Sequence, residues 1–493
     1  MNLRTSSNGD GESMSKNPFV IIIIILFAIT PVISFNYLPL IDYPDHLATM
    51  QIRNTIHSNI NLARFYEFRW ILTPYLGLDL LATPFLPLFS VETVGKIVIV
   101  FTFVLICAAT VLLDQQLNPN NCGLSVFAGI FLYNGAFNWG WMNYIIGIGF
   151  AIVAFWIWVR YRERSVGVSI VLFILLGVIV CLMHFFAFLV YGVFVAGYEC
   201  SIFLEKLKVE RRLRMSLFRI PFRAAVSLIV PLLAILSRTP GNHGQTVWGR
   251  SWGPQTFWVS FVEWKGEALV SPLYFHHFSE KLLLVAMVAI LVWALATRTL
   301  VVNSRMLIPL AAFGVIFMVM PTELLGWFGP DYRLPSGVAF FALASFGWGE
   351  ASPARINVVC LLLGFCLILR VASVFSNWQR AQPIIAEYDT ALQLVPPGSR
   401  LEFIVGDGGW SNPPLVHVPV LPAVKRGVYV PNINYGELGL VKKRDPVPSS
   451  IKDFDYLLEI RDPYFEIPAG ISLKEVGRGL TFRLYRIDQG TAK

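Results

Sequence analysis

Charged residues are scarce in this chain. Only 14% of its 493 residues are Asp, Glu, Lys or Arg, whereas soluble domains carry about 25%. Hydrophobic residues make up 55% of the chain, and they gather in repeated apolar runs of the kind that cross a bilayer as helices. These two features exclude an ordinary soluble enzyme and predict a polytopic membrane protein.

Three further absences narrow the function. The six cysteines lie mostly within or beside apolar runs and show no metal-type spacing, so neither a disulfide framework nor a zinc motif is predicted. No glycine-rich phosphate loop is evident, because VGDGGW (405–410) lacks the helix that must follow one. No internal repeat is evident either, which weakens a transporter interpretation, since transporter folds are commonly built from repeated halves.

The apolar runs predict an all-α membrane domain of about eleven transmembrane helices within residues 18–374. Residues 1–17 are polar and predict a disordered cytoplasmic tail. The run at 17–35 predicts an uncleaved anchor, because it has no small-residue cleavage site. The other runs lie at about 93–113, 123–138, 142–159, 166–183, 186–203, 224–238, 281–297, 306–322, 336–350 and 356–374.

Basic residues predict the orientation, because cytoplasmic loops carry an excess of Lys and Arg. The formal charge of +8 is explained in this way, and nucleic-acid binding is not predicted. The N-terminus is then inside and the C-terminus outside, and outer loops span 36–92 and 239–280. Within the first loop, the proline-containing segment 70–89 predicts a helix along the outer interface. The basic stretches on the N-terminal side are RYRER (160–164), EKLKVERRLRMSLFRIPFR (205–223), RTLVVNSR (298–305) and Arg355.

Beyond residue 375 the composition changes to that of a soluble domain. Residues 377–395 predict a helix, and 400–406, 454–460 and 480–487 predict strands. Residues 375–493 therefore predict a small extracytoplasmic α/β domain. No organelle address is evident, which favours the inner (cytoplasmic) membrane of a bacterium.

Three ionisable residues, Asp42, Asp45 and His46, lie where the chain leaves the predicted anchor. Pro44 suits the first turn of a helix reaching about residue 58, and the i, i+3 and i, i+4 spacings then place all three on one face. Capping of that helix by one aspartate is the simpler interpretation, but it does not account for the second acid and the histidine. Ionisable groups beside membrane spans are functional candidates by default.

Other polar residues map to the same predicted face. Asn138 and Asn143 flank two tryptophans in the second outer turn, where they could orient a sugar or a headgroup while the tryptophans anchor the interface. His184 interrupts a long apolar stretch and is either a substrate contact or a structural residue. Arg333 could hold a phosphate by forked hydrogen bonds, unless Asp331 forms a local salt bridge with it.

The outer loop 239–280 is rich in tryptophan, which could stack on sugar rings or dip into lipid headgroups. Its adjacent histidines do not predict a zinc site, because neighbouring residues point in different directions and no third ligand is near in sequence. The residues concerned are Trp248, Trp252, Trp258, Trp264, Arg250, Lys265, His276 and His277.

This arrangement resembles the GT-C superfamily of integral membrane glycosyltransferases, which includes protein O-mannosyltransferases, oligosaccharyltransferases and aminoarabinose transferases. The resemblance rests on DYPDH (42–46) directly after an anchor helix, on about ten further spans and on an outer C-terminal domain. It implies a polyprenyl-phosphate sugar donor and a carboxylate base, Asp42 first and Asp45 next. Many members carry a second acid in the second outer loop, whereas NWGWMN (138–143) has asparagines, so no divalent metal or other cofactor is indicated.

The chemistry fits that resemblance. A carboxylate can take the proton of an attacking hydroxyl of a glycan, lipid or protein acceptor. The lipid phosphate then leaves as an anion beside a cation such as Arg333, while His46 orients the base or contacts the phosphate. A single base opposite the leaving group implies inversion. The alternatives are a polysaccharide polymerase or ligase with a lipid-pyrophosphate donor, a transporter or flippase that uses Asp/His as a proton relay, and a non-catalytic scaffold.

Overall fold

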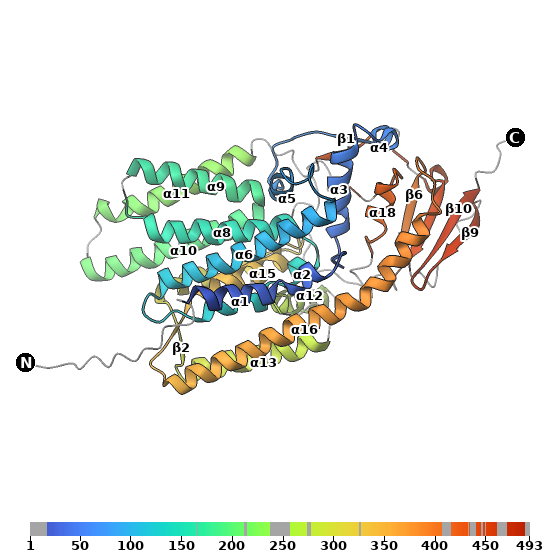
Figure 1. The fold of residues 1–493 in the computed structure, drawn as a ribbon. Helices are drawn as coiled ribbons and strands as arrows, with labels where there is room; N and C mark the ends of the chain where they lie inside the picture. Colours follow the sequence, from blue (N-terminus) through green and yellow to red (C-terminus); the bar gives the residue numbers. More distant parts are fainter. Residues whose placement is uncertain are drawn as a thin grey trace, which may run out of the picture.

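The structure is a computed structural model, and it shows a bundle of helices with a small sheet at one end (Figure 1). It describes residues 17–164, 166–211, 214–236, 257–273, 278–324, 327–406, 416–431, 433, 440–444, 447–448, 450–460 and 471–488.

Within the residues that the structure describes, six helices are long and apolar enough to cross a membrane. Figure 1 shows most of them running roughly along one direction, as expected for a bundle that buries its apolar side chains together. Their presence supports the predicted membrane protein, while the number of spans and their topology stay predictions. The six are α6 (Val91–Leu117), α8 (Met142–Tyr161), α10 (Phe185–Glu210), α11 (Met215–Leu236), α13 (Phe278–Ala296) and α16 (Pro353–Leu392).

Other predicted spans form shorter or interrupted helices. The anchor run breaks at Ile29 into two helices, because Pro31 supplies no amide hydrogen for a continuous ladder. The run at 123–138 begins as a 3₁₀ helix rather than an α-helix. The shorter elements are α1 (Pro18–Ala28), α2 (Thr30–Ser34), η2 (Leu124–Phe131), α7 (Gly135–Asn138), α9 (Val166–Met183), α12 (Phe257–Val270), η3 (Ser304–Met306), α14 (Leu307–Val319) and α15 (Pro330–Ala344).

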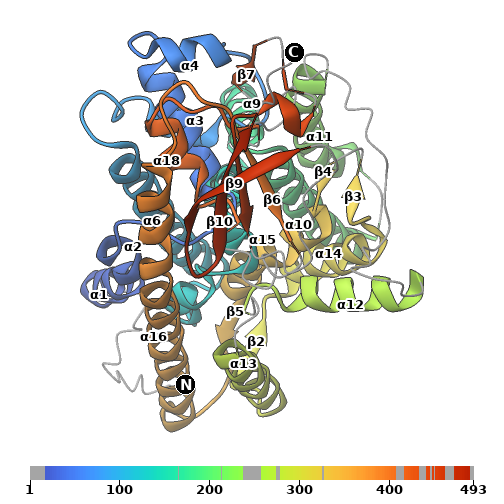
Figure 2. The ribbon, with the colours of Figure 1, turned by 90° about the vertical axis from the view of Figure 1, so that its right-hand side faces the viewer.

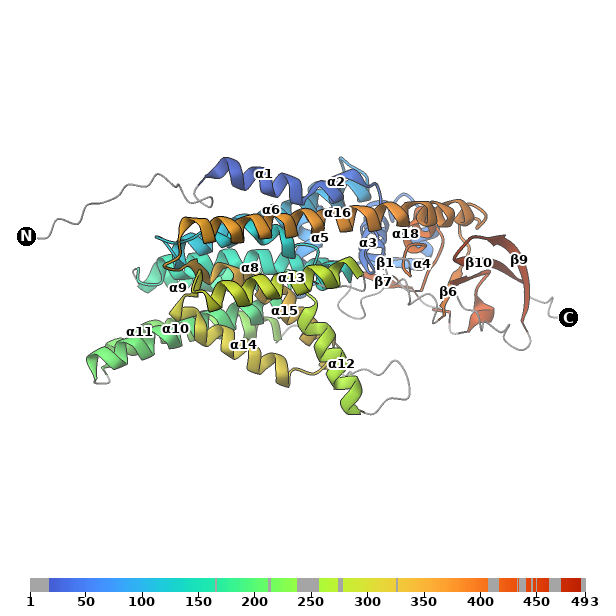
Figure 3. The same ribbon diagram turned by 90° about the horizontal axis from the view of Figure 1, so that it is seen from below.

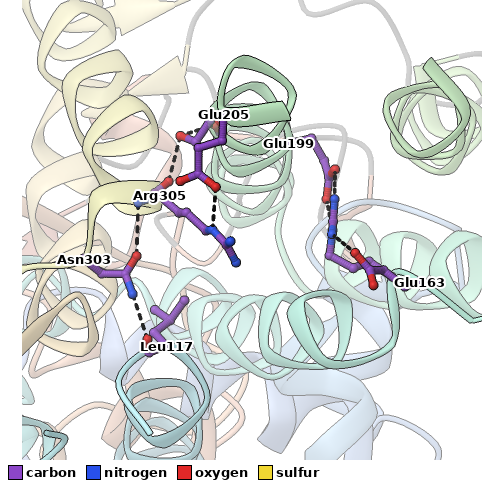
Figure 4. Close-up of polar contacts among 9 residues, drawn as sticks. Leu117, Glu163, Glu199, Glu205, Asn303 and Arg305 are labelled. Carbon is purple, nitrogen blue, oxygen red and sulfur yellow. Dashed lines mark hydrogen bonds and ion pairs between the residues drawn. The ribbon is translucent and has the colours of Figure 1, made fainter. Parts of the chain in front are cut away.

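One end of the bundle is fastened by charged residues from the predicted cytoplasmic stretches (Figure 4). Arg162 donates to both carboxylate oxygens of the buried Glu199, over 2.6 and 2.5 Å, and also pairs with Glu163. Arg305 pairs with Glu205 at 3.1 Å. These contacts bring the stretches 160–164, 205–223 and 298–305 to the same end of the bundle, while their side of the membrane stays a prediction.

The opposite end carries the C-terminal sheet. Helix α16 continues without interruption through residue 375, and Figure 3 shows it running from the bundle to the sheet. The sheet has the order β6-β8-β10-β9, with β6 and β8 parallel and the other pairs antiparallel. The three predicted strands correspond to β6, β8 and β10, whereas β9 was not predicted because it is largely polar. Their bounds are β6 (Leu401–Val405), β8 (Tyr456–Ile460), β9 (Ser472–Arg478) and β10 (Phe482–Asp488).

Residues 36–92, the predicted first outer loop, contact the C-terminal segment. Helix α3 (Tyr43–Thr55) packs against α18 (Val420–Lys425), and Figure 2 shows the two lying beside each other. Strand β1 (Tyr66–Phe68) pairs with β7 (Val441–Lys443), so both parts of the chain share a small sheet. These contacts bring residues near position 42 close to residues near position 417.

The remaining elements are short. Segment 70–89 contains only α5 (Gly77–Ala82) followed by turns, so it has no helix long enough to cross a membrane. The other short elements are α4 (Ile60–Phe65), the hairpin of β3 (Glu323–Leu324) and β4 (Trp327–Phe328), the pair of β2 (Leu300–Val302) and β5 (Phe346–Trp348), and η6 (Ile451–Asp453).

Candidate functional site

The start of α3 is held by the second outer turn. The amide of Asp42 donates to the carbonyl of Trp139 over 3.0 Å, and the backbone of Gly140 lies against the same residue. Asp42 occupies the N-cap position of α3, but its side chain forms no capping hydrogen bond. Capping therefore does not explain the carboxylate of Asp42.

Three side chains converge beside this helix start. Asp42, Asp45 and His417 each offer one ligand-type atom, and these atoms lie within 4.8 Å of one another. Nδ1 of His417 lies 2.6 Å from Oδ2 of Asp45. His417 comes from the C-terminal segment, just before α18, so the cluster is built from residues far apart in the sequence. We call these three residues the outer triad.

Burial and charge shift the titration of the outer triad. Burial raises the pKa of Asp42 to about 6, against the opposing effects of His417, Arg333 and a hydrogen bond from Trp141. Burial also raises the pKa of Asp45, while His417 opposes that shift. Burial alone lowers the pKa of His417, but the charge and hydrogen bond of Asp45, with the charge of Asp42, raise it to about 9. At neutral pH the imidazole is therefore protonated in the ion pair.

Arg333, at the start of α15, is buried against the ring of Trp141, which is an unusual position for a cation. Its guanidinium stacks 3.8 Å from the centre of the Trp141 ring, and one Nη donates to the carbonyl of Phe328. The side chain is buried, its Nε has no hydrogen-bond partner, and no described carboxylate forms an ion pair with it. Burying a charge without an ion-pair partner is costly, which favours an anionic ligand as the missing partner.

Asp331 does not form the local salt bridge with Arg333 that the sequence left open. Instead it pairs with Lys265 of α12 at 2.8 Å and accepts hydrogen bonds from the indole of Trp264 at 3.1 Å. Lys265 also donates to the carbonyls of Phe317 and Met320. This network fixes α12 against α15 and leaves Arg333 without a carboxylate from its own helix.

The other predicted site residues hydrogen-bond backbone groups of the described elements. His46 hydrogen-bonds the carbonyl of Gly140 through Nε2 at 3.1 Å, and burial lowers its pKa to about 4. Asn138 donates to the carbonyls of residues 133 and 134. Asn143 accepts from the amide of Leu78 at 2.7 Å, and His184 accepts from Phe186 at the start of α10. These hydrogen bonds are structural, and a contact of the same residues with substrate stays a prediction.

An apolar cavity of about 400 Å³ lies between η2, α12, α13, α14, α15 and α16. Its lining includes Leu334 and Pro335, the two residues that follow Arg333 in α15. Such a cavity accepts hydrocarbon rather than a charged group.

Several residues of the tryptophan-rich loop lie outside the described residues. These are Trp248, Arg250, Trp252, His276 and His277, and residues 407–410 of the glycine-containing stretch VGDGGW are also outside. The side chain of Trp258 is likewise not described.

Comparison with known proteins assigns no family, because no family model and no curated protein matches the chain. Sequence reasoning missed His417, Trp141 and Lys265 as partners of the predicted groups. Trp141 was noted as an interfacial anchor, and Lys265 as a loop cation, but no local signal pointed to His417.

Proposed function

We propose that the protein is a membrane glycosyltransferase that moves a sugar from a polyprenyl-phosphate donor to a hydroxyl acceptor at the extracytoplasmic face. The observation that carries the proposal is the placement of Trp141, which donates a hydrogen bond to Asp42 and stacks under the guanidinium of Arg333. A base and an unpaired cation thus flank one aromatic side chain.

Each group has a chemical role in this reaction. Asp42 takes the proton of the acceptor hydroxyl, and its pKa near 6 suits a base at neutral pH. As the acceptor oxygen bonds to the anomeric carbon, the bond from that carbon to the phosphate oxygen breaks. The polyprenyl phosphate leaves with the bonding electron pair, and Arg333 stabilises its negative charge in a site with little water. Attack opposite the leaving group inverts the anomeric centre.

The apolar cavity beside α15 supports a lipid-linked donor. Its lining is apolar and would accept hydrocarbon, and it includes the two residues that follow Arg333, which would hold the phosphate. A lipid-borne phosphate and a water-soluble or membrane acceptor meet only at the membrane surface, which accounts for a transferase in a bacterial inner membrane. The acceptor is a glycan, a lipid or a protein.

A polymerase or ligase with a lipid-pyrophosphate donor is the second candidate. The same unpaired guanidinium favours it, because a pyrophosphate is also a leaving anion that needs a forked cation. The donor therefore separates the two candidates, and a flippase or scaffold would transfer no sugar from either donor.

The test is sugar transfer in membranes that contain the full-length protein, with labelled polyprenyl-phosphate and polyprenyl-pyrophosphate sugars offered separately. We expect transfer from the monophosphate donor, and a loss of roughly 10²–10⁴-fold in Asp42→Asn. Asp79→Asn is the matched control, because Asp79 is another largely buried outer aspartate that pairs with Arg53 instead. Equal transfer by wild type and Asp42→Asn refutes the role of Asp42, and no transfer from any donor refutes the enzyme.

A further inference from the structure

The outer triad has the composition of a cation site. Two carboxylates and one imidazole offer oxygen and nitrogen ligands within 4.8 Å of one another. Asp45 is 4% exposed, yet its Oδ1 has no hydrogen-bond partner among the described residues. A buried carboxylate oxygen without a partner is costly, and a cation satisfies it.

We propose that Asp42, Asp45 and His417 bind one divalent transition-metal cation of the Zn²⁺ or Mn²⁺ class. Both ions accept a mixed set of carboxylate oxygens and imidazole nitrogen, whereas Mg²⁺ favours oxygen alone. Two carboxylates and a neutral imidazole carry two negative charges, which a divalent ion balances. When the cation binds, the proton that His417 carries in the ion pair passes to solvent.

The ligand atoms must move closer together to share one ion. Ligands at about 2.1 Å from one ion lie at most about 4.2 Å apart, so a pair at the 4.8 Å limit closes by at least about 0.6 Å. The 2.6 Å between His417 Nδ1 and Asp45 Oδ2 opens slightly, to the roughly 3 Å expected of adjacent ligands.

The backbone around the triad is already fixed. Asp42 and Asp45 are one turn apart on α3, and the amide of Asp42 is bonded to Trp139. The segment after His417 is held on α3 by the packing of α18, and Lys425 of α18 pairs with Glu92. Because the ligands are held in place before the ion arrives, little ordering entropy opposes binding.

The third ligand comes from a part of the chain that the sequence did not connect with the site. The second outer turn has asparagines, and the structure uses Asn138 and Asn143 for backbone contacts instead. His417 supplies the ligand from the C-terminal segment. The cation then joins that segment to the first outer loop, and one oxygen of Asp42 remains outside the set of ligands.

The inference rests on the three side chains and not on sugar transfer, so it is tested without any donor. Purified full-length protein in detergent is treated with a chelator, exchanged into chelator-free buffer and titrated with Zn²⁺ by calorimetry or with Mn²⁺ by electron paramagnetic resonance. We expect one ion per chain, and at least 10-fold weaker binding in Asp45→Asn and His417→Gln. His57→Gln is the matched control, because His57 is exposed on the same loop.

A spectroscopic measurement on the wild-type protein tests the imidazole ligand directly and does not depend on the folding of any variant. Bound Mn²⁺ is expected to show electron spin-echo modulation from one imidazole nitrogen in the wild type, and this signal disappears in His417→Gln. No binding of either ion by wild type up to about 1 mM, or binding without the nitrogen signal, overturns the inference. Cation binding without sugar transfer refutes only the proposed enzyme, and transfer without cation binding refutes only the cation site.

Discussion

The buried ion pair between α13 and α16 allows a quantitative prediction of stability. Arg370 Nη1 lies 2.5 Å from Glu280 Oε1, and the guanidinium also donates to the carbonyls of Leu273 and Tyr133. Arg370 and Glu280 are 1% and 3% exposed, so water does not replace a lost partner. The pair therefore fastens the last long helix to the bundle.

The magnitude follows from this burial. Glu280→Gln changes the shape of the side chain little but leaves the guanidinium charge without its counter-ion, which costs about 3–5 kcal/mol of unfolding free energy. Replacing both residues, in Glu280→Gln/Arg370→Met, removes the buried charge as well. The double variant is expected to lose only about 1–3 kcal/mol, because two carbonyls lose a donor.

The assay is unfolding of the full-length protein in mixed micelles by titration with dodecyl sulfate, followed by circular dichroism. Arg305→Gln is the control, because its pair with Glu205 is partly exposed and is worth at most about 1 kcal/mol. A cost below about 1 kcal/mol for Glu280→Gln would show that the pair is not desolvated as argued. The same follows if the double variant loses as much unfolding free energy as Glu280→Gln and Arg370→Met lose together when each is made alone.

Three further predictions concern the outer face. Gly140→Ala should weaken cation binding and sugar transfer, because φ is +80° there and a Cβ would lie 2.7 Å from the amide nitrogens of Asp42 and Tyr43. Gly266→Ala is the control in the same assays, because a Cβ there would meet no described atom within 4 Å apart from its chain neighbours and its own helix backbone. Burial raises the pKa of Asp79 from 3.8 to about 6, so the folded protein binds this proton more tightly than the unfolded chain does. The stability that the protonated carboxyl contributes is present below about pH 4 and is lost as pH rises through about 6. Unfolding midpoints of the wild type should therefore fall over that range by more than those of Asp79→Asn, and equal slopes would contradict this. Lys425→Ala should cost at most about 1 kcal/mol in thermal unfolding, because its pair with Glu92 is partly exposed, and a larger loss would show a stronger tie.

Local patterns predicted the parts of the fold that depend on neighbouring residues. The apolar runs predicted the long helices, Pro44 predicted the start of α3, and the short runs at 400–406, 454–460 and 480–487 predicted three strands of the sheet. The i, i+3 spacing of Asp42 and Asp45 also placed both carboxylates in one cluster. All of these features are fixed within a few residues of the chain.

Features that depend on packing between distant segments could not be predicted in this way. His417 reaches Asp45 only because α18 packs on α3, and neither segment carries a signal for the other. Asp331 has Arg333 two residues away, but burial of α12 against α15 gives it Lys265 as its partner. Asn138 and Asn143, which the sequence suggests could orient a sugar or a headgroup, also hydrogen-bond backbone groups of neighbouring elements, and those partners could not be predicted from local sequence.

Helix α16 also sets the direction in which the C-terminal sheet faces relative to the bundle. Its 40 residues extend about 60 Å, roughly twice the thickness of the hydrocarbon core, so one continuous helix fixes both the distance of the sheet from the bundle and the direction in which the sheet faces. Inserting one residue between 376 and 392 would lift the sheet by about 1.5 Å and turn it by about 100° about the rod. A change of one residue in length there would therefore turn the sheet away from the direction in which it faces in this structure.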